Sequence, residues 1–524
     1  MQTERFYQLR KKFGLSQETM AELFSVSRQS IQKWESGKAV PDIERLIAIA
    51  DYFHVSTDFL LRKEDTRSID QMRIEKDILP HYQSMHTWDL YSSALMIEYA
   101  QCIDEGKEIA SYKNLFQEIA VLPASKHKED LADVLFHLLQ ESPTSQTHLY
   151  HEPSDLSEIK NARKKSVLSL PKAGEQKHKI HGAWVGRICG CLLGKTVEGI
   201  SCEELTTLLK ATDNFPMNRY IMKKEIPEHI TKELVFDLKS RRCFADEISC
   251  APSDDDTNYT VLAMQLIEKY GKAFTPEHVA SIWVELQGKN AYCTAERVAY
   301  LNFMNGFAPP ASAVYKNPYR EWIGAQIRGD YFGYLCPGNP EMAAELAWRD
   351  ASISHVKNGI YGEMFVAAML ACAAVISDIK QIVLCGIGEI PQHSRLYERI
   401  ATLVEQYESG VAKDDWFRAF HTRYNDRIGH DWCHTISNAE LVAASLLYGE
   451  GDYTKSICLA VQNGFDTDCN GATVGSVIGM RNGIDGIDAT WQAPIHNTLD
   501  TTIFGVGKVN ILDLVEKTLQ QIAT

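Results

Sequence analysis

The apolar and polar positions of residues 1 to about 65 repeat with the period of short amphipathic helices. "ERFYQLRKKFG" predicts a helix that ends at Gly14, and Ser16 is placed to cap the next helix, "QETMAELFS". A short turn at "SVS" leads to "RQSIQKWESG", and Pro41 opens a further helix in "DIERLIAIADYFHV". Two short helices joined by a tight turn, the second rich in Arg, Gln, Ser and Lys, are the helix-turn-helix arrangement.

The middle of the chain, residues 66 to about 175, carries few motifs. "WDLYSSALMIEYAQCI" and "KEDLADVLFHLLQ" have helical periodicity, and "ESPTSQTHLYHEPSD" is typical of a loop. From about residue 176 onward, apolar helices alternate with short glycine-rich or polar corners, and strand-like runs are scarce. The pattern predicts an all-α protein: a helix-turn-helix bundle at 1–65, a helical connector of unassigned function at 66–175 and a large helical domain at 176–524.

Composition is that of an ordinary globular protein. The 524 residues, 45% hydrophobic and 23% charged, suit two or three domains. A formal net charge of −15 argues against nucleic-acid binding over the whole surface but leaves room for a local DNA-binding module. The longest apolar stretch, 364–377, is too short to span a bilayer and predicts a buried helix. With no signal-like run at the N-terminus and thirteen cysteines that form no C-x-x-C pair, we expect reduced thiols, no membrane contact and a cytoplasmic protein.

Three adjacent aspartates open the helix predicted in "PSDDDTNYTVLAMQLIEKY", at 252–270. Helix capping explains one or two acids at a helix start but explains three poorly, because their charges repel one another. A hard cation such as Mg²⁺ takes oxygen ligands and cancels that repulsion. A second acidic pair, Asp466 and Asp468, precedes a small-residue helix in "NGFDTDCNGATVGSVIGM". Two clusters of the same construction favour a metal site, with one cation or a pair held between two helix starts.

Residues 3–62 resemble the Xre/Cro/C1 family of repressors. The matches include "LSQETMAELFSVSRQSIQKWESGKAVPD" and "LIAIADYFHVSTDFLL", in which the apolar positions, both turns and the W-E-x-G-K-x-x-P tail coincide. The resemblance implies that the second helix of the motif enters the major groove of double-stranded DNA. By position, it implies base contacts from Arg28, Gln29 and Ser30, followed by Gln32 and Lys33, and phosphate contacts from Gln17 and Lys38.

The same bundle could instead serve dimerisation or protein contact, and a homodimer is one expectation. Residues 1–65 carry ten basic and ten acidic side chains. That balance weakens the case for DNA binding, because neutralisation of the phosphates normally supplies much of the affinity for DNA. The predicted recognition helix itself carries the basic and amide side chains, which favours DNA binding.

The domain from 176 opens with "HGAWVGRICGCLLGKTVEGI", whose small residues at close spacing let helices approach tightly. Four blocks within 178–485 resemble, in order, the ADP-ribosylglycohydrolase family: "GRICGCLLGKTVEG", "SDDDT", "GAQIRGDYFGYLCPGNPEMAAELAWRDASISHVKNGIYGEMFVAAML" and "GFDTDCNGATVGSVIG". The resemblance implies an all-α bundle around a binuclear Mg²⁺ centre. It also implies hydrolysis of the N- or O-glycosidic bond between ADP-ribose and a protein side chain or small acceptor.

Carried over by position, the resemblance implies two candidate catalytic carboxylates, Glu198 beside the scissile ribose as general acid or base, and Asp256. The implied metal ligands are Ser253 or Asp254, which two alignments place at the family's threonine, with Asp255, Asp256, Asp466, Asp468 and Cys469. Cys469 stands where the family usually has another threonine. Sulfur is a poor ligand for Mg²⁺, so we expect the second metal to be weaker, absent or a different ion.

The third block implies contacts with the substrate. The implied residues are Gly324, Ala325 and Gln326 for the diphosphate, His355 for a ribose hydroxyl, and Asn358, Gly359 and Tyr361. A lone histidine is often a satisfied core residue, and Tyr361 either stacks on adenine or simply packs.

Two functions from different classes follow. The first is a Mg²⁺-dependent ADP-ribosyl hydrolase coupled to a DNA-binding module. The second is a transcriptional regulator whose C-terminal domain senses ADP-ribose or a related nucleotide with little or no turnover. Glu198 and the four aspartates favour turnover, whereas Cys469 favours the sensor. The acceptor that carries ADP-ribose, whether protein-linked or a small molecule, is marked by no motif.

Overall fold

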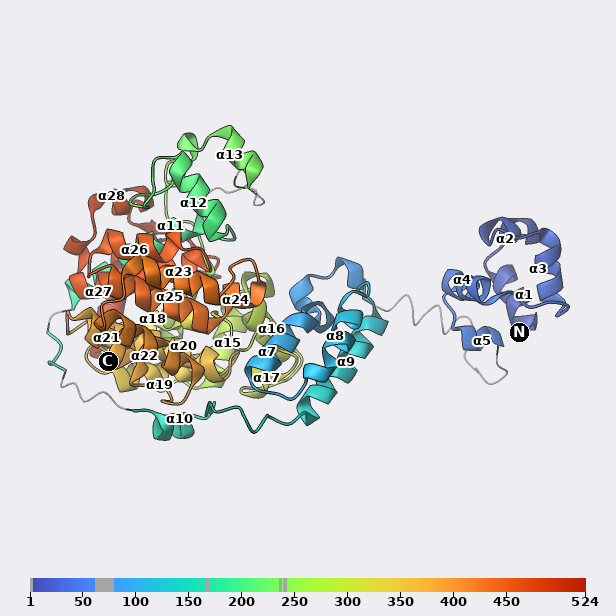
Figure 1. Ribbon diagram of the computed structural model, residues 1–524, viewed down its shortest axis with the longest axis horizontal. Coiled ribbons are helices and arrows are strands. Elements are labelled where there is room, and N and C mark those ends of the chain that lie inside the picture. The colour runs from blue at the N-terminus through green and yellow to red at the C-terminus, as the bar shows by residue number, and fades with distance from the viewer. Residues whose placement is uncertain (1–2, 62–79, 165–169, 175, 235–237, 239–242) are drawn as a thin grey trace. The chain divides into compact units, whose positions relative to one another are not determined.

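The computed structural model describes residues 3–61, 80–164, 170–174, 176–234, 238 and 243–524. Helices dominate it (Figure 1), and the only strands in these ranges are the short antiparallel pair β1 (Thr498–Leu499) and β2 (Val509–Asn510). The all-α prediction is confirmed. The chain forms two compact units, Met1–Met85 and His86–Thr524. The predicted domain boundary at 65–66 falls on residues outside the described ranges, and so does residue 175 of the boundary at 175–176.

The first unit is a bundle of short helices whose starts are set by local caps. The helices are α1 (Thr3–Lys12), α2 (Gln17–Leu23), α3 (Arg28–Glu35), α4 (Ile43–Phe53) and α5 (Thr57–Leu61). As predicted, Ser16 caps α2: its Oγ accepts the N–H of Thr19 at 3.0 Å. Ser27 Oγ accepts the N–H of Ser30 at 3.1 Å and caps α3 in the same way. Their apolar faces meet in one core around Trp34.

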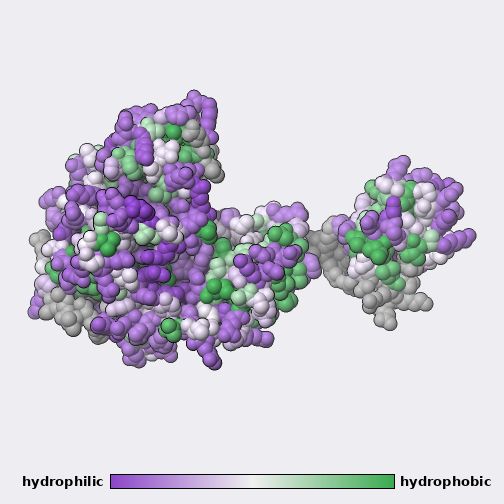
Figure 2. Space-filling model, in the orientation of Figure 1, coloured by the Kyte–Doolittle hydropathy of each residue, from purple (hydrophilic) through white to green (hydrophobic). Residues whose placement is uncertain are grey.

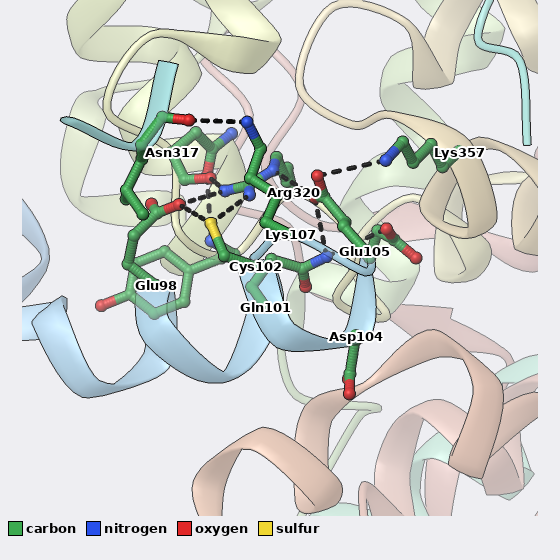
Figure 3. A network of polar contacts seen from close by, with 12 residues as sticks. Glu98, Gln101, Cys102, Asp104, Glu105, Lys107, Asn317, Arg320 and Lys357 are labelled. Atoms are coloured by element: carbon green, nitrogen blue, oxygen red, sulfur yellow. Dashed lines mark hydrogen bonds and ion pairs between the residues drawn. The ribbon is translucent and has the colours of Figure 1, made fainter. Parts of the chain in front are cut away.

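The connector is helical, and its described helices pack as part of the second unit. They are α7 (Leu95–Asp104), α8 (Lys113–Ala120), α9 (Lys126–Glu141) and α10 (Leu156–Ala162). Buried ion pairs join α7 to the following domain (Figure 3): Arg320 lies 2.9 Å from Glu98 and 2.7 Å from Glu105, and Lys357 lies 3.1 Å from Glu105. Breaking a buried pair leaves an uncompensated charge, so these contacts hold α7 in one position on the domain.

Residues 176–524 form a large helical domain. Its helices are α11 (Lys177–Lys195), α12 (Cys202–Ala211), α13 (Glu228–Glu233), α14 (Asp255–Tyr270), α15 (Pro276–Leu286), α16 (Thr294–Met304), α17 (Ala311–Val314), α18 (Asp330–Tyr334), α19 (Pro340–Ala351), α20 (Lys357–Ala373), α21 (Ile379–Ile387), α22 (Arg395–Glu408), α23 (Lys413–Arg423), α24 (Gly429–Cys433), α25 (Thr435–Tyr448), α26 (Tyr453–Gln462), α27 (Thr467–Asn482), α28 (Ala489–Gln492) and α29 (Ile511–Ala523).

The apolar stretch at 364–377 lies mainly in α20, which is buried from Asn358 to Ala373, as predicted for a core helix. Within the described ranges, no helix is both long enough and apolar enough to cross a membrane. In the view of Figure 2, hydrophobic side chains gather on the segment of α7–α9, where Leu115, Val121 and Val134 are exposed. The surface of the large domain is mainly hydrophilic in the same view.

Candidate metal centre and active site

Helices α11 and α27 pack in direct backbone contact and bring distant parts of the sequence together. A Cβ atom added to Gly186 would lie 2.2 Å from the carbonyl oxygen of Gly475, so only glycine fits there. Farther along, Thr467 Oγ1 donates to the carbonyl of Gly194 at 2.9 Å. The helices run antiparallel, and the C-terminal end of α11 therefore meets the N-terminal end of α27. The close approach predicted from the small residues is present.

The three adjacent aspartates stand at the start of α14 and have different surroundings. Asp254 is the N-cap, and its Oδ1 accepts the N–H of Asp256 at 3.0 Å. Ser253, just before the cap, and Asp255, in the first turn, are half-buried, and Asp256 is fully buried. Capping thus accounts for one of the three aspartates. The other two need a different explanation.

The start of α27 is held by side chains of α24 and α25. Phe465 has φ of +60°, a conformation that costs free energy in a non-glycine residue and that surrounding contacts must maintain. Trp432 Nε1 donates to the carbonyl of Phe465 at 2.6 Å, and Asn438 Oδ1 accepts the N–H of Asp466 at 3.2 Å and the side-chain amide of Asn470 at 2.8 Å. These hydrogen bonds fix the backbone at Asp466 and therefore the direction of its side chain.

The two acidic clusters meet. Asp256, Asp468 and Cys469 each offer a ligand atom within 4.8 Å of the others. Burial, together with the neighbouring carboxylates, raises the pKa of Asp255, Asp256 and Asp468 well above the usual value. Burial likewise raises the pKa of Asp466 to about 6, to which the charges of Glu198 and Asp254 also contribute. Several buried carboxylates therefore repel one another at one point in the domain.

A divalent cation fits these carboxylates. Asp256 Oδ2 is buried and has no hydrogen-bond partner among the described residues, and an oxygen in that state is costly unless something positive faces it. Mg²⁺ takes carboxylate oxygens and would cancel the repulsion. Asp255, Asp256, Asp466 and Asp468 fit this role. The thiol of Cys469 fits it poorly, because burial raises its pKa well above the usual value and sulfur is a soft ligand.

Two basic side chains from α11 enter the acidic cluster, and sequence reasoning missed both. Arg187 Nη2 lies 3.1 Å from Asp256 Oδ1 and donates to the Asp256 carbonyl at 2.8 Å, while its Nη1 lies 2.8 Å from Asp330 Oδ2. Lys195 Nζ lies 2.5 Å from Asp254 Oδ2. Although burial opposes it, the ammonium of Lys195 holds the pKa of Asp254 below its usual value. The sequence did contain a signal that could have identified them, because Arg187 and Lys195 are the only basic residues in the glycine-rich block "GRICGCLLGKTVEG".

The helix-turn-helix unit presents a row of polar side chains on α3. The exposed ones among the predicted DNA contacts are Arg28, Gln29, Gln32, Lys33 and Lys38. Arg28 pairs with Glu18 at 2.7 Å, but both side chains are more than half exposed, and such surface pairs are weak. Gln17 and Ser30 are engaged within the unit: Gln17 Nε2 donates to Glu35 at 2.6 Å, and the Ser30 hydroxyl lies 2.9 Å from that of Ser27.

Each of the two units contains a match to a protein family. Residues 173–523 match the family model described as ADP-ribosylglycohydrolase, and residues 6–60 match one described as helix-turn-helix. The first match covers well over half of the chain. The chain belongs to the ADP-ribosylglycohydrolase family. It joins a domain of this family to an N-terminal helix-turn-helix domain, as the resemblance predicted.

Individual relatives match the two domains separately. The N-terminal domain is 47% identical over 62 residues to the HTH-type transcriptional activator BcrR of Enterococcus faecalis, covering 12% of this chain and 30% of that protein. It is 42% identical over 59 residues to the SPbeta prophage-derived HTH-type transcriptional regulator YonR of Bacillus subtilis, covering 11% of this chain and 55% of that one. The chain thus spans less than two thirds of these regulators. A solved structure titled "ADP-ribosylglycohydrolase-related protein complex" matches with 16% identity and a TM-score of 0.38, covering 67% of this chain and 98% of that one.

Glu198 lies at the edge of the acidic cluster of the glycohydrolase domain. It follows α11 directly, is half-buried and precedes Gly199, whose φ of +85° turns the chain away. Its charge contributes to the raised pKa of Asp255, Asp466 and Asp468, where burial is the larger cause. The structure therefore brings Glu198 to the carboxylates of both clusters. Because it is only half-buried, this carboxylate is also accessible to solvent.

The predicted diphosphate-binding residues of the glycohydrolase domain are buried. Gly324 packs so closely on Glu296 that an added Cβ would lie 1.8 Å from its Oε1, and Ala325 is buried beside it. Gln326, which begins the short 3-10 helix η8 (Gln326–Arg328), has both amide atoms buried with no hydrogen-bond partner in the described part of the chain. Arg328 lies 3.1 Å from Glu296 and has a structural role in this buried ion cluster. The amide of Gln326 is the group in this block that a ligand or a water could satisfy.

Of the four predicted substrate contacts after Arg328, one has a polar atom that no described residue satisfies, and the other three are occupied by contacts within the protein. His355 Nδ1 lies 2.8 Å from the Ser354 hydroxyl, and its Nε2 is buried without a partner in the residues described; burial holds its pKa well below the usual value, so the ring is neutral. The packed ones are Asn358, which donates to Glu152 and Glu321 at 2.8 and 2.9 Å, Gly359, which lies against the Arg320 carbonyl, and Tyr361, which donates to the Pro153 carbonyl. The Tyr361 ring is fully buried and presents no face to an adenine, so it packs.

Proposed function

We propose that the glycohydrolase domain hydrolyses an ADP-ribosyl glycosidic bond with the help of Mg²⁺. The observation that carries the proposal is the meeting of Asp256 and Asp468, from two helix starts about 210 positions apart, with a buried oxygen on Asp256 that no described residue satisfies. Asp255 and Asp466 are their close neighbours in sequence. Such a cluster is unstable in a protein core unless a cation is part of it. Family membership supports the reaction class.

Each residue has a distinct task in this proposal. Bound Mg²⁺ supplies a Lewis acid that polarises a ribose hydroxyl or water. Arg187 binds Asp256 through Oδ1 and leaves Oδ2 for the cation. Glu198, at the edge of the cluster, transfers the proton as general acid or base, a role worth about 10²–10⁴-fold in rate. The neutral ring of His355 and the amide of Gln326 are buried polar groups that a ribose hydroxyl and a diphosphate would satisfy.

We propose further that the N-terminal unit binds double-stranded DNA through α3. Arg28 and Gln29 are exposed at the start of this helix and suit bidentate contacts with guanine and adenine. Val40, Ile43 and Ile47 are exposed apolar side chains of the same unit, and self-association through them would set two recognition helices on a two-fold DNA site. A selection from genomic DNA fragments tests this role. If no sequence is enriched, the unit serves dimerisation instead.

A second function draws support from Cys469 and Lys195. A sulfur among the metal ligands and an ammonium on Asp254 both weaken a centre built for two Mg²⁺ ions. On this alternative the protein is a transcriptional regulator, and its C-terminal domain binds ADP-ribose or a related nucleotide with little or no turnover.

One experiment separates the two. The full-length protein is incubated with ADP-ribosylated arginine, serine and DNA, with Mg²⁺ or with EDTA, and released ADP-ribose is quantified by chromatography. Mg²⁺-dependent release that Glu198→Gln abolishes would support the hydrolase. Binding of ADP-ribose by calorimetry without release from any of the three would support the sensor. Release that is equal in EDTA would remove the metal from the mechanism.

A further inference from the structure

The acidic cluster contains two neighbouring positions for positive charge. Asp256, Asp468 and Cys469 form one group, and Cys191, Asp254 and Asp256 form another; within each group one ligand atom per residue lies within 4.8 Å of the others. Asp256 belongs to both groups. A pair of cations bridged by Asp256 would use both positions, as two-metal hydrolytic sites do.

A positive charge of the protein itself lies at the second position. Lys195 Nζ is 2.5 Å from Asp254 Oδ2, while Asp254 Oδ1 accepts the N–H of Asp256 at 3.0 Å. Both oxygens of Asp254 are therefore engaged, and its side chain is only 1% exposed. A divalent ion at Asp254 would have to displace the ammonium or lie beside it, where burial makes the repulsion of like charges strong.

Each position includes one buried thiol, Cys191 at the Lys195 position and Cys469 at the other, so the poor donor sulfur does not distinguish them. The carboxylates do. Asp254 at the Lys195 position is already paired, whereas Asp468 at the other position lies at the start of α27, next to Asp466. The buried Oδ2 of Asp256, which no described residue satisfies, remains available as a ligand. The position of Asp256 and Asp468 thus keeps an oxygen donor for a cation, whereas an ion pair fills the other position.

We propose that the ammonium of Lys195 replaces one of the two cations, so that the centre holds a single divalent ion at the position of Asp256 and Asp468. The inference rests on the proposed metal-dependent function. Lys195 is then a positioning residue: it neutralises Asp254 permanently, whatever the metal concentration. Lys195 is the last residue of α11, and the glycine contacts that set α11 against α27 therefore fix where its side chain begins.

Counting bound Mn²⁺ tests this inference, because Mn²⁺ accepts the same oxygen ligands as Mg²⁺ and is visible by electron paramagnetic resonance. Equilibrium dialysis of the full-length wild-type protein should give one ion per chain. Cys469→Thr, which restores an oxygen donor but keeps Lys195, should also give one. Adding Lys195→Met to Cys469→Thr should give two, and adding Lys195→Arg, which keeps the charge, should give one.

The outcomes are distinguishable. Two ions in the wild type or in Cys469→Thr would overturn the inference and leave a metal-dependent hydrolase intact. One ion in Lys195→Met with Cys469→Thr would also overturn it, because the ammonium would then not be what excludes the second ion. No bound Mn²⁺ in any protein would overturn the proposed metal dependence together with this inference. If circular dichroism shows that the Lys195→Met protein does not fold, Lys195→Gln in the same background takes its place, with the same two outcomes.

Discussion

Replacing Asp466 by Asn should change how the stability of the metal-free protein depends on pH. Burial, with added repulsion from Glu198 and Asp254, raises the pKa of this carboxyl from 3.8 to about 6. A raised pKa in the folded state means that the folded protein holds the proton more tightly than the unfolded chain does. The stability due to this proton is fully present below about pH 4 and is lost as the pH rises through about 6.

The size of the effect follows from the two pKa values. At about 1.4 kcal/mol per pH unit, the difference between 3.8 and about 6 corresponds to about 3 kcal/mol of unfolding free energy. With an unfolding entropy of about 2.1 cal/mol/K per residue, residues 86–524 would lose about 3 °C in Tm between about pH 4 and pH 7. Asp466→Asn removes this titration while keeping the shape of the side chain, and it costs no cap, because the Asp466 side chain makes no capping hydrogen bond to α27.

The assay is thermal unfolding by calorimetry in EDTA from pH 4.5 to 7.5. The Tm of Asp466→Asn minus that of the wild type should rise across this range by about 2 °C, because at pH 4.5 part of the effect is already lost. Asp378→Asn is the matched control: Asp378 is the exposed N-cap of α21 and accepts the N–H of Gln381 at 2.9 Å, so its difference from the wild type should stay constant. Saturating Mg²⁺ should remove the rise for Asp466→Asn, because the cation replaces the protons. A constant difference in EDTA would refute the convergence of carboxylates at Asp466.

Three further predictions concern other parts of the chain. Asp256→Asn should lower the metal-dependent hydrolysis by about 100-fold or more, measured as release of ADP-ribose; unchanged activity would remove this residue from the metal site. Arg28→Ala should relax discrimination at one base pair by about 1–3 kcal/mol, whereas Lys38→Ala should weaken binding to all sequences and lower its salt dependence, both measured by fluorescence anisotropy. Gly190→Ala should destabilise the domain by about 1–3 kcal/mol or more, because its Cβ would lie 2.0 Å from a carbonyl of α27, whereas Gly429→Ala, with open space around it, should be mild.

Signals that act within one helical turn were sufficient to predict the local structure. Ser16 caps α2 because a side chain and an N–H three residues later interact whatever the rest of the chain does. The burial of α20 followed from a run of apolar residues that no surface helix would carry. The four blocks of the glycohydrolase domain also named the acidic residues, although their meeting rested on resemblance rather than on spacing.

Contacts between side chains from distant segments could not be predicted from the sequence. Asn358 and Tyr361 stand in a recognisable block, yet their polar atoms bind Glu152, Glu321 and the carbonyl of Pro153, which only the folded chain brings near. The docking of the connector through Arg320 depends in the same way on contacts more than 200 residues apart in sequence. Such pairings leave no periodic trace, because each partner satisfies its local helix equally well without the other.

The sequence by itself determined that the chain is helical, where its recognition helix and acidic helix starts lie, and that Asp254, Asp255 and Asp256 are too many for a cap. The tertiary structure alone decided which aspartate caps and which faces the cluster, and that Lys195 lies on Asp254. The physical reason is the packing of α11 on α27, where glycine carbonyls leave no room for a side chain. That contact sets the register of two helices almost 300 residues apart, and the position of every charge at their ends follows from it.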